Sequence, residues 1–261
     1  GRAGLPQAHP GVWGMTATPL RIAMWSGPRN ISTAMMRAFE NRPDTAVVDE
    51  PLYGAWLEAT GESHPMADEI IEAMETDWRV VWRELAGPVP GGKAIWYQKH
   101  MTHHLLPPML DAEWLGAFTH VFLIRDPRAV VASYLNKRDT VSDEAIGVPQ
   151  QWALYRFVTE ELGQDPPIID SGEFLRDPEG HLRALCDRLG IEFTDRMLRW
   201  PEGPRETDGL WAPHWYDMVW KSTGFGPPPA ALPDLDGDAA DVAACCVPSY
   251  ERLFEKRLRP G

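Results

Sequence analysis

Short runs of apolar residues alternate along the chain with longer segments of helical periodicity. The runs that predict strands are residues 21–25, 45–49, 93–98, 119–124 and a few residues within 166–174. The segments that predict helices are residues 31–41, 66–85, 127–137, 149–162, 178–189 and 238–258. Within 66–85, Ile70, Met74, Trp78, Val81 and Leu85 recur at steps of three or four and form one apolar face. The alternation predicts an α/β fold with a central, mostly parallel sheet covered by helices on both faces.

Capping residues mark several element ends. Asp126 followed by Pro127 is a typical helix start, and Gly190 is expected to close the helix at 178–189. Residues 200–233 are rich in Pro, Gly and Trp and predict an ordered loop region, and no repeat or linker divides the chain. Residues 1–14 lack the pattern of a signal peptide and are interpreted as an expression-tag remnant, which leaves 15–261 as a single domain.

Composition narrows the set of partners. The chain carries 25 Lys and Arg against 38 Asp and Glu, a formal net charge of −13. An acidic protein repels nucleic acid and anionic lipid, so we expect neither as a partner. No apolar run approaches the roughly 20 residues of a membrane span. The three cysteines, two of them adjacent, favour reduced thiols and a cytoplasmic protein.

The first predicted strand leads into a helix through a loop of polar and cationic residues. Backbone N–H groups at a helix N-terminus attract anions, and Arg29 adds a fork-shaped cation beside them. The candidate anion ligands are Gly27, Pro28, Arg29, Asn30, Ile31, Ser32 and Thr33. The loop is not a Walker A motif, because it lacks the second Gly and the Lys. The same residue types cap helices, so an anion site and an ordinary strand-to-helix turn both remain open.

A second loop follows the apolar strand at 119–124. Arg125 stands at the expected carboxyl end of that strand, where ligands bind in open α/β sheets. Ser133 comes two helical turns later, so loop and helix could close on one phosphate. The alternative is that Arg125 forms a structural ion pair with Asp126 or Asp49.

Together these loops resemble the two nucleotide-binding motifs of the sulfotransferases that use 3′-phosphoadenosine 5′-phosphosulfate (PAPS). Residues 28–33, PRNIST, resemble the loop that holds the 5′-phosphosulfate. Arg125-Asp126-Pro127 with Ser133 resembles the segment that binds the 3′-phosphate, in both residues and spacing. Residues 172–193 resemble a third segment of that family, so the resemblance runs in order over about residues 21–193.

The resemblance implies a P-loop-like three-layer αβα fold, PAPS as donor, its product PAP, and no required metal. It assigns Arg29 to stabilising the leaving group, and Arg125 and Ser133 to the 3′-phosphate. Arg205 weakly resembles a residue of the family's C-terminal loop and is a further candidate for that phosphate. Residues 171–172 are Ser and Gly where many cytosolic members have Tyr and Glu, which leaves the adenine contact open.

Two residues are candidates for the catalytic base. Glu50 follows the second strand beside the phosphate loop, as a Glu does in several bacterial and Golgi-type members. Its alternative role is a salt bridge to Arg29. His100 follows the third strand in a stretch that resembles K-T-H-L-P of cytosolic members, and His103 and His104 are second choices. An ordinary His titrates near working pH, which suits a base.

Lys99, next to His100, is interpreted as a solvated surface side chain, with assistance to the leaving group as the alternative. The histidines at 100, 103 and 104 lack the H-E-x-x-H spacing and have no cysteine pair nearby. We therefore expect no metal site.

An aromatic segment at 209–220 concentrates rings near the end of the domain. Such rings either line a substrate site, including one for an ammonium group, or pack the C-terminal segment onto the core. The candidate acceptor-binding residues are Tyr53, Trp56, His103, Trp211 and His214. The overall acidity favours a neutral or cationic acceptor.

The sequence thus predicts transfer of the sulfuryl group of PAPS to a hydroxyl or amine of a small molecule. The alternatives are a kinase-like phosphotransferase on the same fold and a non-catalytic protein that binds PAP or PAPS. The oligomeric state is left open, with a homodimer among the options.

Overall fold

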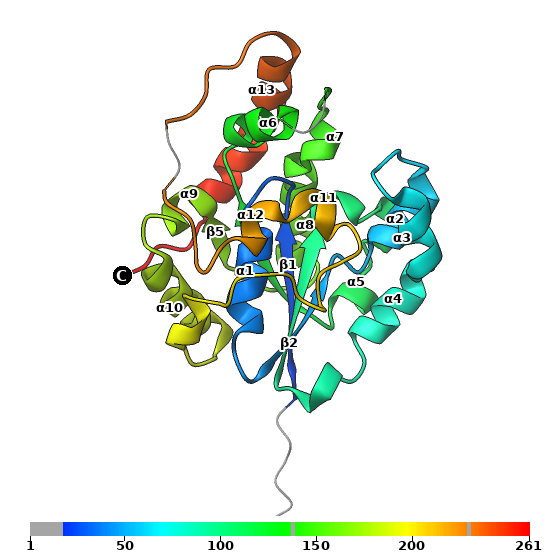
Figure 1. The fold of residues 1–261 in the computed structure, drawn as a ribbon, viewed down its shortest axis with the longest axis vertical. Helices are drawn as coiled ribbons and strands as arrows, with labels where there is room; N and C mark the ends of the chain where they lie inside the picture. The colour runs from blue at the N-terminus through cyan, green and yellow to red at the C-terminus, as the bar shows by residue number, and fades with distance from the viewer. Residues whose placement is uncertain (1–17, 137–138, 229–230) are drawn as a thin grey trace, which may run out of the picture.

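The computed structural model describes residues 18–136, 139–228 and 231–261. The central sheet is wholly parallel. Its five strands are β1 (Leu20–Ser26), β2 (Thr45–Asp49), β3 (Ile95–Met101), β4 (Thr119–Ile124) and β5 (Ile168–Asp170). Their order across the sheet is β2-β3-β1-β4-β5. Figure 1 shows β1 rising through the middle of the molecule. The predicted fold class is confirmed, with β2 and β4 at the expected bounds.

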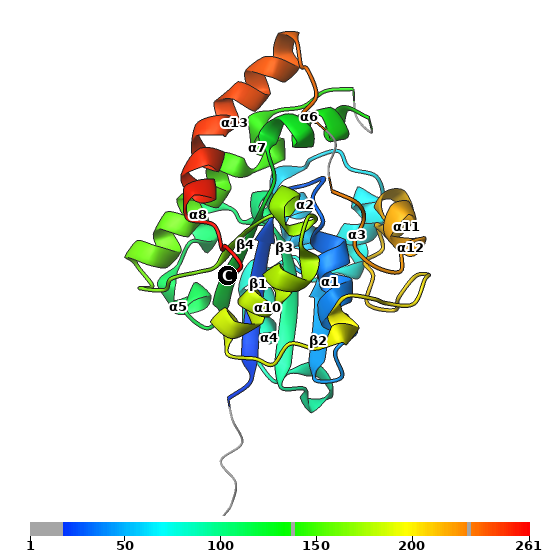
Figure 2. The same cartoon turned by 90° about the vertical axis from the view of Figure 1, so that its left-hand side faces the viewer.

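The main helices lie on the two faces of this sheet or beyond its carboxyl edge. They are α1 (Ser32–Glu40), α2 (Tyr53–Thr60), α3 (Ala67–Ala73), α4 (Trp78–Leu85), α6 (Pro127–Leu135), α8 (Val148–Glu160), α10 (Pro178–Leu189) and α13 (Gly237–Glu255). Shorter turns are α5 (Ala112–Leu115), α7 (Asp143–Ile146), α9 (Ser171–Phe174), α11 (Ala212–Trp215), α12 (Asp217–Trp220), and the 3₁₀ turns η1 (Pro90–Gly92), η2 (Thr102–His104), η3 (Pro107–Met109) and η4 (Asp195–Met197). The long α13 packs along α6 and α8 (Figure 2).

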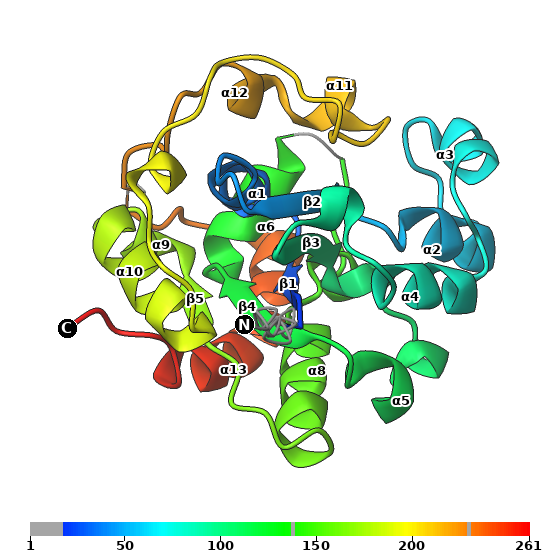
Figure 3. The same ribbon diagram turned by 90° about the horizontal axis from the view of Figure 1, so that it is seen from below.

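Alternation along the strands divides the core into two layers. Trp25 of β1 faces a layer with Trp82 of α4 and Leu154 of α8. Met24, its neighbour, faces the opposite layer with Phe39 of α1 and residues of α10. Successive strand residues point to opposite faces. Helices cover both faces of the sheet (Figure 3), so the central strands are buried on both sides.

One helix prediction is wrong in extent. The segment 66–85 forms two helices, α3 and α4, rather than one. Met74 ends α3 in an extended conformation (φ −110°, ψ 156°), and the Asp77 side chain starts α4 by accepting from the Arg79 N–H. The capping carboxylate of Asp77 thus starts a new helix, although the apolar periodicity continues across the break. Asp126 and Gly190 cap their helices as predicted.

Residues 203–220, here called the strap, lie within the region predicted as an ordered loop and also contain two short helices, α11 and α12. The strap passes outside α1 and β2 and reaches the side of α2 and α3 (Figure 3). Within the described ranges no helix is both long and apolar enough to cross a bilayer. Residues 1–14, interpreted as a tag remnant, lie outside the described residues.

Candidate functional site

A cavity of about 1820 Å³ opens at the carboxyl ends of the central strands. Its wall is built from the loops after β1, β2 and β4, the turn η2 after β3, and part of the strap. In a doubly wound sheet this edge, where the strand order changes direction, is the usual ligand site. Most of the predicted donor-binding and acceptor-binding residues line this cavity.

The loop after β1 holds a cationic residue in a constrained backbone. Arg29 has a φ of 53°, in the left-handed region that non-glycine residues seldom adopt. The Asn30 side chain donates to the Leu123 carbonyl at 3.2 Å and accepts from the Ile31 N–H at 2.8 Å. The N-terminus of α1 receives no side-chain cap, so its first N–H groups remain available to an anion.

The two predicted nucleotide loops meet in the structure. Arg29 Nε donates to Ser133 Oγ at 3.1 Å, and Arg125 donates to the Arg29 carbonyl. Among the described residues no carboxylate forms an ion pair with Arg29 or Arg125. The carboxylates proposed as alternatives are engaged elsewhere, Asp126 with Arg128 at 2.6 Å and Asp49 with a lysine of β3.

Both arginines are therefore partly buried cations with room for an anion. Burial lowers the pKa of Arg29 and of Arg125, and the two charges also oppose each other. Such a pair is stabilised when an anion enters between them. Pro28, Ile31, Ser32 and Thr33 line the same end of the cavity.

Gly27 acts in a different way from the other loop residues. It does not line the cavity, and a Cβ at this position would lie 2.7 Å from the Ile146 carbonyl oxygen. The missing side chain lets the loop approach α7 closely.

Glu50, the predicted base, stands where β2 ends and lines the cavity. Its φ of 43° is again left-handed, and its N–H donates to the Lys99 carbonyl at 2.9 Å. Its side chain pairs with Lys99 Nζ at 2.8 Å, and not with Arg29. Burial raises the pKa of the Glu50 carboxyl, and the Lys99 charge opposes that rise.

Lys99 is the centre of a buried polar cluster. The interpretation of Lys99 as a solvated surface residue is wrong, because the residue is 1% exposed. Its ammonium donates to Asp49 at 2.9 Å, to Glu50 at 2.8 Å and to the Tyr216 hydroxyl at 2.6 Å. Burial lowers the pKa of Lys99, but the two carboxylates outweigh it and hold the pKa well above its ordinary value.

His100, the alternative base, lies on the other face of β3. Its ring stacks on Trp25 at 4.5 Å between centroids, contacts Trp82, and bonds Gln98 at 3.2 Å. Burial lowers the pKa of His100 to about 3. It does not line the cavity, so the structure separates His100 from Glu50.

Most of the predicted acceptor residues form one aromatic wall. Tyr53, Trp56, His103 and Trp211 line the cavity, with His104 stacked on Tyr53 at 4.5 Å between centroids. These rings also pack α2 and the strap together, so the wall is at the same time part of the core. His214 is exposed and does not line the cavity.

A protein-family model described as a sulfotransferase domain matches residues 20–257. The chain belongs to the sulfotransferase family. Two relatives, the branched-chain-amino-acid aminotransferase-like proteins 2 and 1 of Arabidopsis thaliana, are 38% identical over 235 residues and 40% identical over 212. These matches cover 89% and 81% of this chain but 41% and 38% of the relatives, so the chain spans about two fifths of their length.

A solved sulfotransferase from Alicyclobacillus acidocaldarius has the same fold. It superposes with a TM-score of 0.56 at 14% identity, covering 92% of this chain and 97% of the other. The sulfotransferase assignment therefore agrees with the order of motifs in the sequence and with the parallel sheet.

Arg205 is not brought to the donor end of this sulfotransferase. Its guanidinium donates to the carbonyls of Pro201, Gly203 and Pro204 and lies 3.9 Å from Glu40. With these contacts Arg205 does not line the cavity.

Sequence reasoning missed two members of the buried cluster, Asp49 and Tyr216. A signal for Asp49 was present, since it ends one core strand and Lys99 lies in another, and the two are register partners. Charged residues at neighbouring positions of buried strands indicate a paired polar site. Tyr216 belongs to the aromatic segment at 209–220, but no pattern indicates that its hydroxyl reaches Asp49, 167 residues earlier in the chain.

Proposed function

We propose that this sulfotransferase moves the sulfuryl group of PAPS to a hydroxyl or amine of a small molecule and releases PAP. The observation that carries the proposal is the meeting of Arg29, Arg125 and Ser133 at one end of a cavity that also contains Glu50. The fit to a donor with two anionic groups is supported by two cations without carboxylate partners in the described chain and by an uncapped α1 N-terminus.

The donor end divides into two subsites. Arg29 and the first N–H groups of α1 would hold the phosphosulfate, because guanidinium and helix N-terminus both bind anionic oxygens. Arg125 and Ser133 would hold the remote phosphate, which is what distinguishes PAPS from ATP. When bound, PAPS supplies the activated sulfuryl group.

The chain's own residues would then carry the transfer. Glu50 accepts the proton of the acceptor hydroxyl as the acceptor oxygen bonds to sulfur. Arg29 neutralises the charge on the phosphate oxygen as its bond to sulfur breaks. The walls of the cavity hold acceptor and donor in line, which removes the entropy cost of their encounter.

The charge at the acceptor end supports a neutral or cationic acceptor. Asp49 and Glu50 place two carboxylates against the single ammonium of Lys99. Burial lowers the pKa of His103 to about 3, and His104 is likewise neutral because burial lowers its pKa well below the ordinary value. A carboxylate on the acceptor would therefore meet no free cation among the described lining residues at this end.

A matched trio of acceptors tests this charge preference. The trio is an amino alcohol, the alcohol with a methyl group in place of the ammonium, and the hydroxy acid with a carboxylate there. We expect kcat/KM for the hydroxy acid to be the lowest of the three, by at least about tenfold. Equal turnover of the hydroxy acid and the other two would contradict the proposed electrostatics.

The donor is tested by thermal-shift titration with PAP, ADP and ATP, with and without Mg²⁺. We expect PAP to stabilise the protein most, whereas stronger stabilisation by ATP with Mg²⁺ would favour the kinase-like alternative. Arg125→Ala should weaken PAP binding by roughly ten- to a hundredfold, since a charged hydrogen-bonded pair is lost. Arg128→Ala is the matched control, because Arg128 lies three residues later, on α6, is half-exposed and pairs with Asp126.

Turnover separates an enzyme from a binding protein. With labelled PAPS and a panel of small alcohols and amines, we expect sulfated product and stoichiometric PAP. Tight PAP binding with no product from any acceptor would support the non-catalytic alternative instead.

A further inference from the structure

The strap brings a tyrosine hydroxyl into the Glu50 cluster from the far end of the chain. Tyr216 is 4% exposed, and its hydroxyl donates to Asp49 Oδ2 at 2.6 Å. The same oxygen accepts from Lys99 Nζ at 2.6 Å and from Trp211 Nε1 at 3.1 Å. All hydrogen-bonding capacity of this hydroxyl is therefore used inside the cluster.

These bonds give the two neighbouring carboxylates different roles. Asp49 accepts from Lys99, from Tyr216 and from the Gly209 N–H at 3.2 Å, and it does not line the cavity. Glu50 lines the cavity, and Lys99 is the partner with which its side chain bonds among the described residues. Asp49 is thus a fully satisfied anion, whereas Glu50 keeps lone pairs open toward the cavity.

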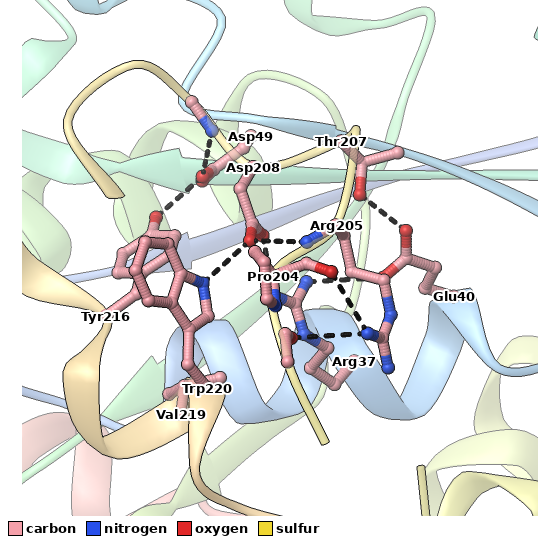
Figure 4. A network of polar contacts seen from close by, with 12 residues as sticks. Arg37, Glu40, Asp49, Pro204, Arg205, Thr207, Asp208, Tyr216, Val219 and Trp220 are labelled. Atoms are coloured by element: carbon pink, nitrogen blue, oxygen red, sulfur yellow. Dashed lines mark hydrogen bonds and ion pairs between the residues drawn. The ribbon is translucent and has the colours of Figure 1, made fainter. Parts of the chain in front are cut away.

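The position of the hydroxyl is fixed from the other end of the strap. Asp208 pairs with the buried Arg37 of α1 at 2.7 Å and accepts from Trp220 Nε1 at 2.9 Å (Figure 4). Thr207 also bonds Glu40 of α1. The strap is therefore fastened to the helix that begins at the donor loop, and Tyr216 is held between that anchor and Asp49.

We propose that Tyr216 is a positioning residue, which together with Asp49 holds the Lys99 ammonium against Glu50 and keeps the Glu50 carboxyl ionised for proton abstraction. The inference rests on the proposed function for its catalytic meaning. The effect of Tyr216 on the ionisation of Glu50 involves only residues of this chain and is measurable without an acceptor.

The direction of the electrostatic effect follows from the groups around Glu50. Burial raises the pKa of Glu50, the Lys99 charge opposes the rise, Asp49 adds to it, and the Tyr216 hydroxyl also opposes it. His104 of η2 is neutral because burial lowers its pKa, and Tyr97 of β3 has a raised pKa and stays neutral too. Removing the Tyr216 hydroxyl lets Lys99 shift toward Asp49, so the pKa of Glu50 rises further.

The matched variants are Tyr216→Phe and Tyr97→Phe. Tyr97 is fully buried on the strand that carries Lys99, and its hydroxyl has no hydrogen-bond partner in the described structure. Both substitutions delete one buried hydroxyl, but Tyr216→Phe alone removes hydrogen bonds to the cluster. A purely structural role would make the two variants alike at Glu50.

The first readout is an NMR titration of the Glu50 carboxyl in protein labelled with ¹³C-glutamate, with the signal assigned by its loss in Glu50→Gln. We expect Tyr216→Phe to raise the midpoint by about one pH unit, and Tyr97→Phe to leave it in place. Trp211→Phe, which removes the donor to the Tyr216 oxygen, is measured in parallel and should move the midpoint the same way by less. An unchanged midpoint in Tyr216→Phe would overturn the inference. If Tyr216→Phe does not fold, an unchanged midpoint in Trp211→Phe would overturn it.

The second readout is kinetic and uses any acceptor that the wild type sulfates. In Tyr216→Phe we expect kcat to fall about tenfold, KM for PAPS to stay the same, and the acid limb of the pH profile to move upward. Thermal stabilisation by PAP should match the wild type, since the donor end is untouched. If the wild type sulfates no acceptor, the proposed function fails, and the NMR titration still decides the role of Tyr216.

Discussion

The environment of His120 leads us to predict that the free energy of unfolding falls in mild acid. His120 is fully buried on β4, and both of its ring nitrogens are engaged. Trp25 Nε1 donates to Nδ1 at 2.9 Å, so Nδ1 carries no proton, and Nε2–H donates to the Leu115 carbonyl at 2.9 Å. A second proton would face the indole N–H, and burial lowers the pKa of His120 to about 4.

The size of the effect follows from that pKa. The folded pKa lies below the ordinary value of 6.5, so the stability from His120 is complete above pH 6.5 and is lost as pH falls toward 4. Between the two pKa values only the unfolded chain binds the proton, so the free energy of unfolding falls by about 1.4 kcal/mol per pH unit. From pH 7 to pH 5 the loss is about 2 kcal/mol, because it begins near pH 6.5. The full loss, below the folded pKa, is about 3 kcal/mol.

The assay is urea unfolding of the wild type and His120→Gln at both pH values. Glutamine keeps an acceptor and a donor but does not titrate. His103 and His104 lie away from His120 and contribute equally to both proteins. We expect the variant to be less stable at neutral pH, yet to lose about 2 kcal/mol less on acidification. His214→Gln, at an exposed position, is the control. Equal losses in wild type and His120→Gln would refute the assignment.

Three further predictions concern the site. If Glu50 is the base, kcat/KM falls on the acid side with a midpoint above pH 4.5, because the pKa of Glu50 is raised. If His100 were the base, its pKa of about 3 would keep kcat/KM constant down to pH 4.5. Glu50→Gln should slow turnover about a hundredfold and leave PAP binding intact. Gly27→Ala should weaken PAP binding in calorimetry, because its Cβ would lie 2.7 Å from the Ile146 carbonyl oxygen and displace the donor loop. Asp208→Asn should lower the free energy of unfolding in urea by about 3 kcal/mol, because it leaves the buried Arg37 with the more distant Glu40, at 3.3 Å, as its carboxylate partner.

The sequence was sufficient for the fold and for the donor loops because both depend on local signals. Strands and helices are encoded by periodicity, and the parallel order then places the ends of β1 and β4 side by side. That adjacency brings Arg29 and Arg125 together, although they lie far apart in the chain. The error at 66–85 has the same origin, since periodicity continued through a point where Asp77 caps a new helix.

The acceptor end was harder to predict because its groups are selected by tertiary packing. Lys99 and His100 are sequence neighbours, but the strand places one in the polar cluster and the other between tryptophans. The phase of a strand buried on both faces cannot be read from alternation, since every position is buried. Tyr216 depends on the path of the strap, for which no short-range pattern exists.

The strap also sets the order in which the centre forms during synthesis. Asp49, Glu50 and Lys99 emerge from the ribosome well before Tyr216, which follows Asp49 by 167 residues. A nascent chain that has completed β1, β2 and β3 still lacks the hydroxyl that satisfies Asp49 and the ring of Trp211 beside it. The polar centre is therefore completed only after residue 216, about five sixths of the way along the chain, has been made, and it belongs to a late step of folding.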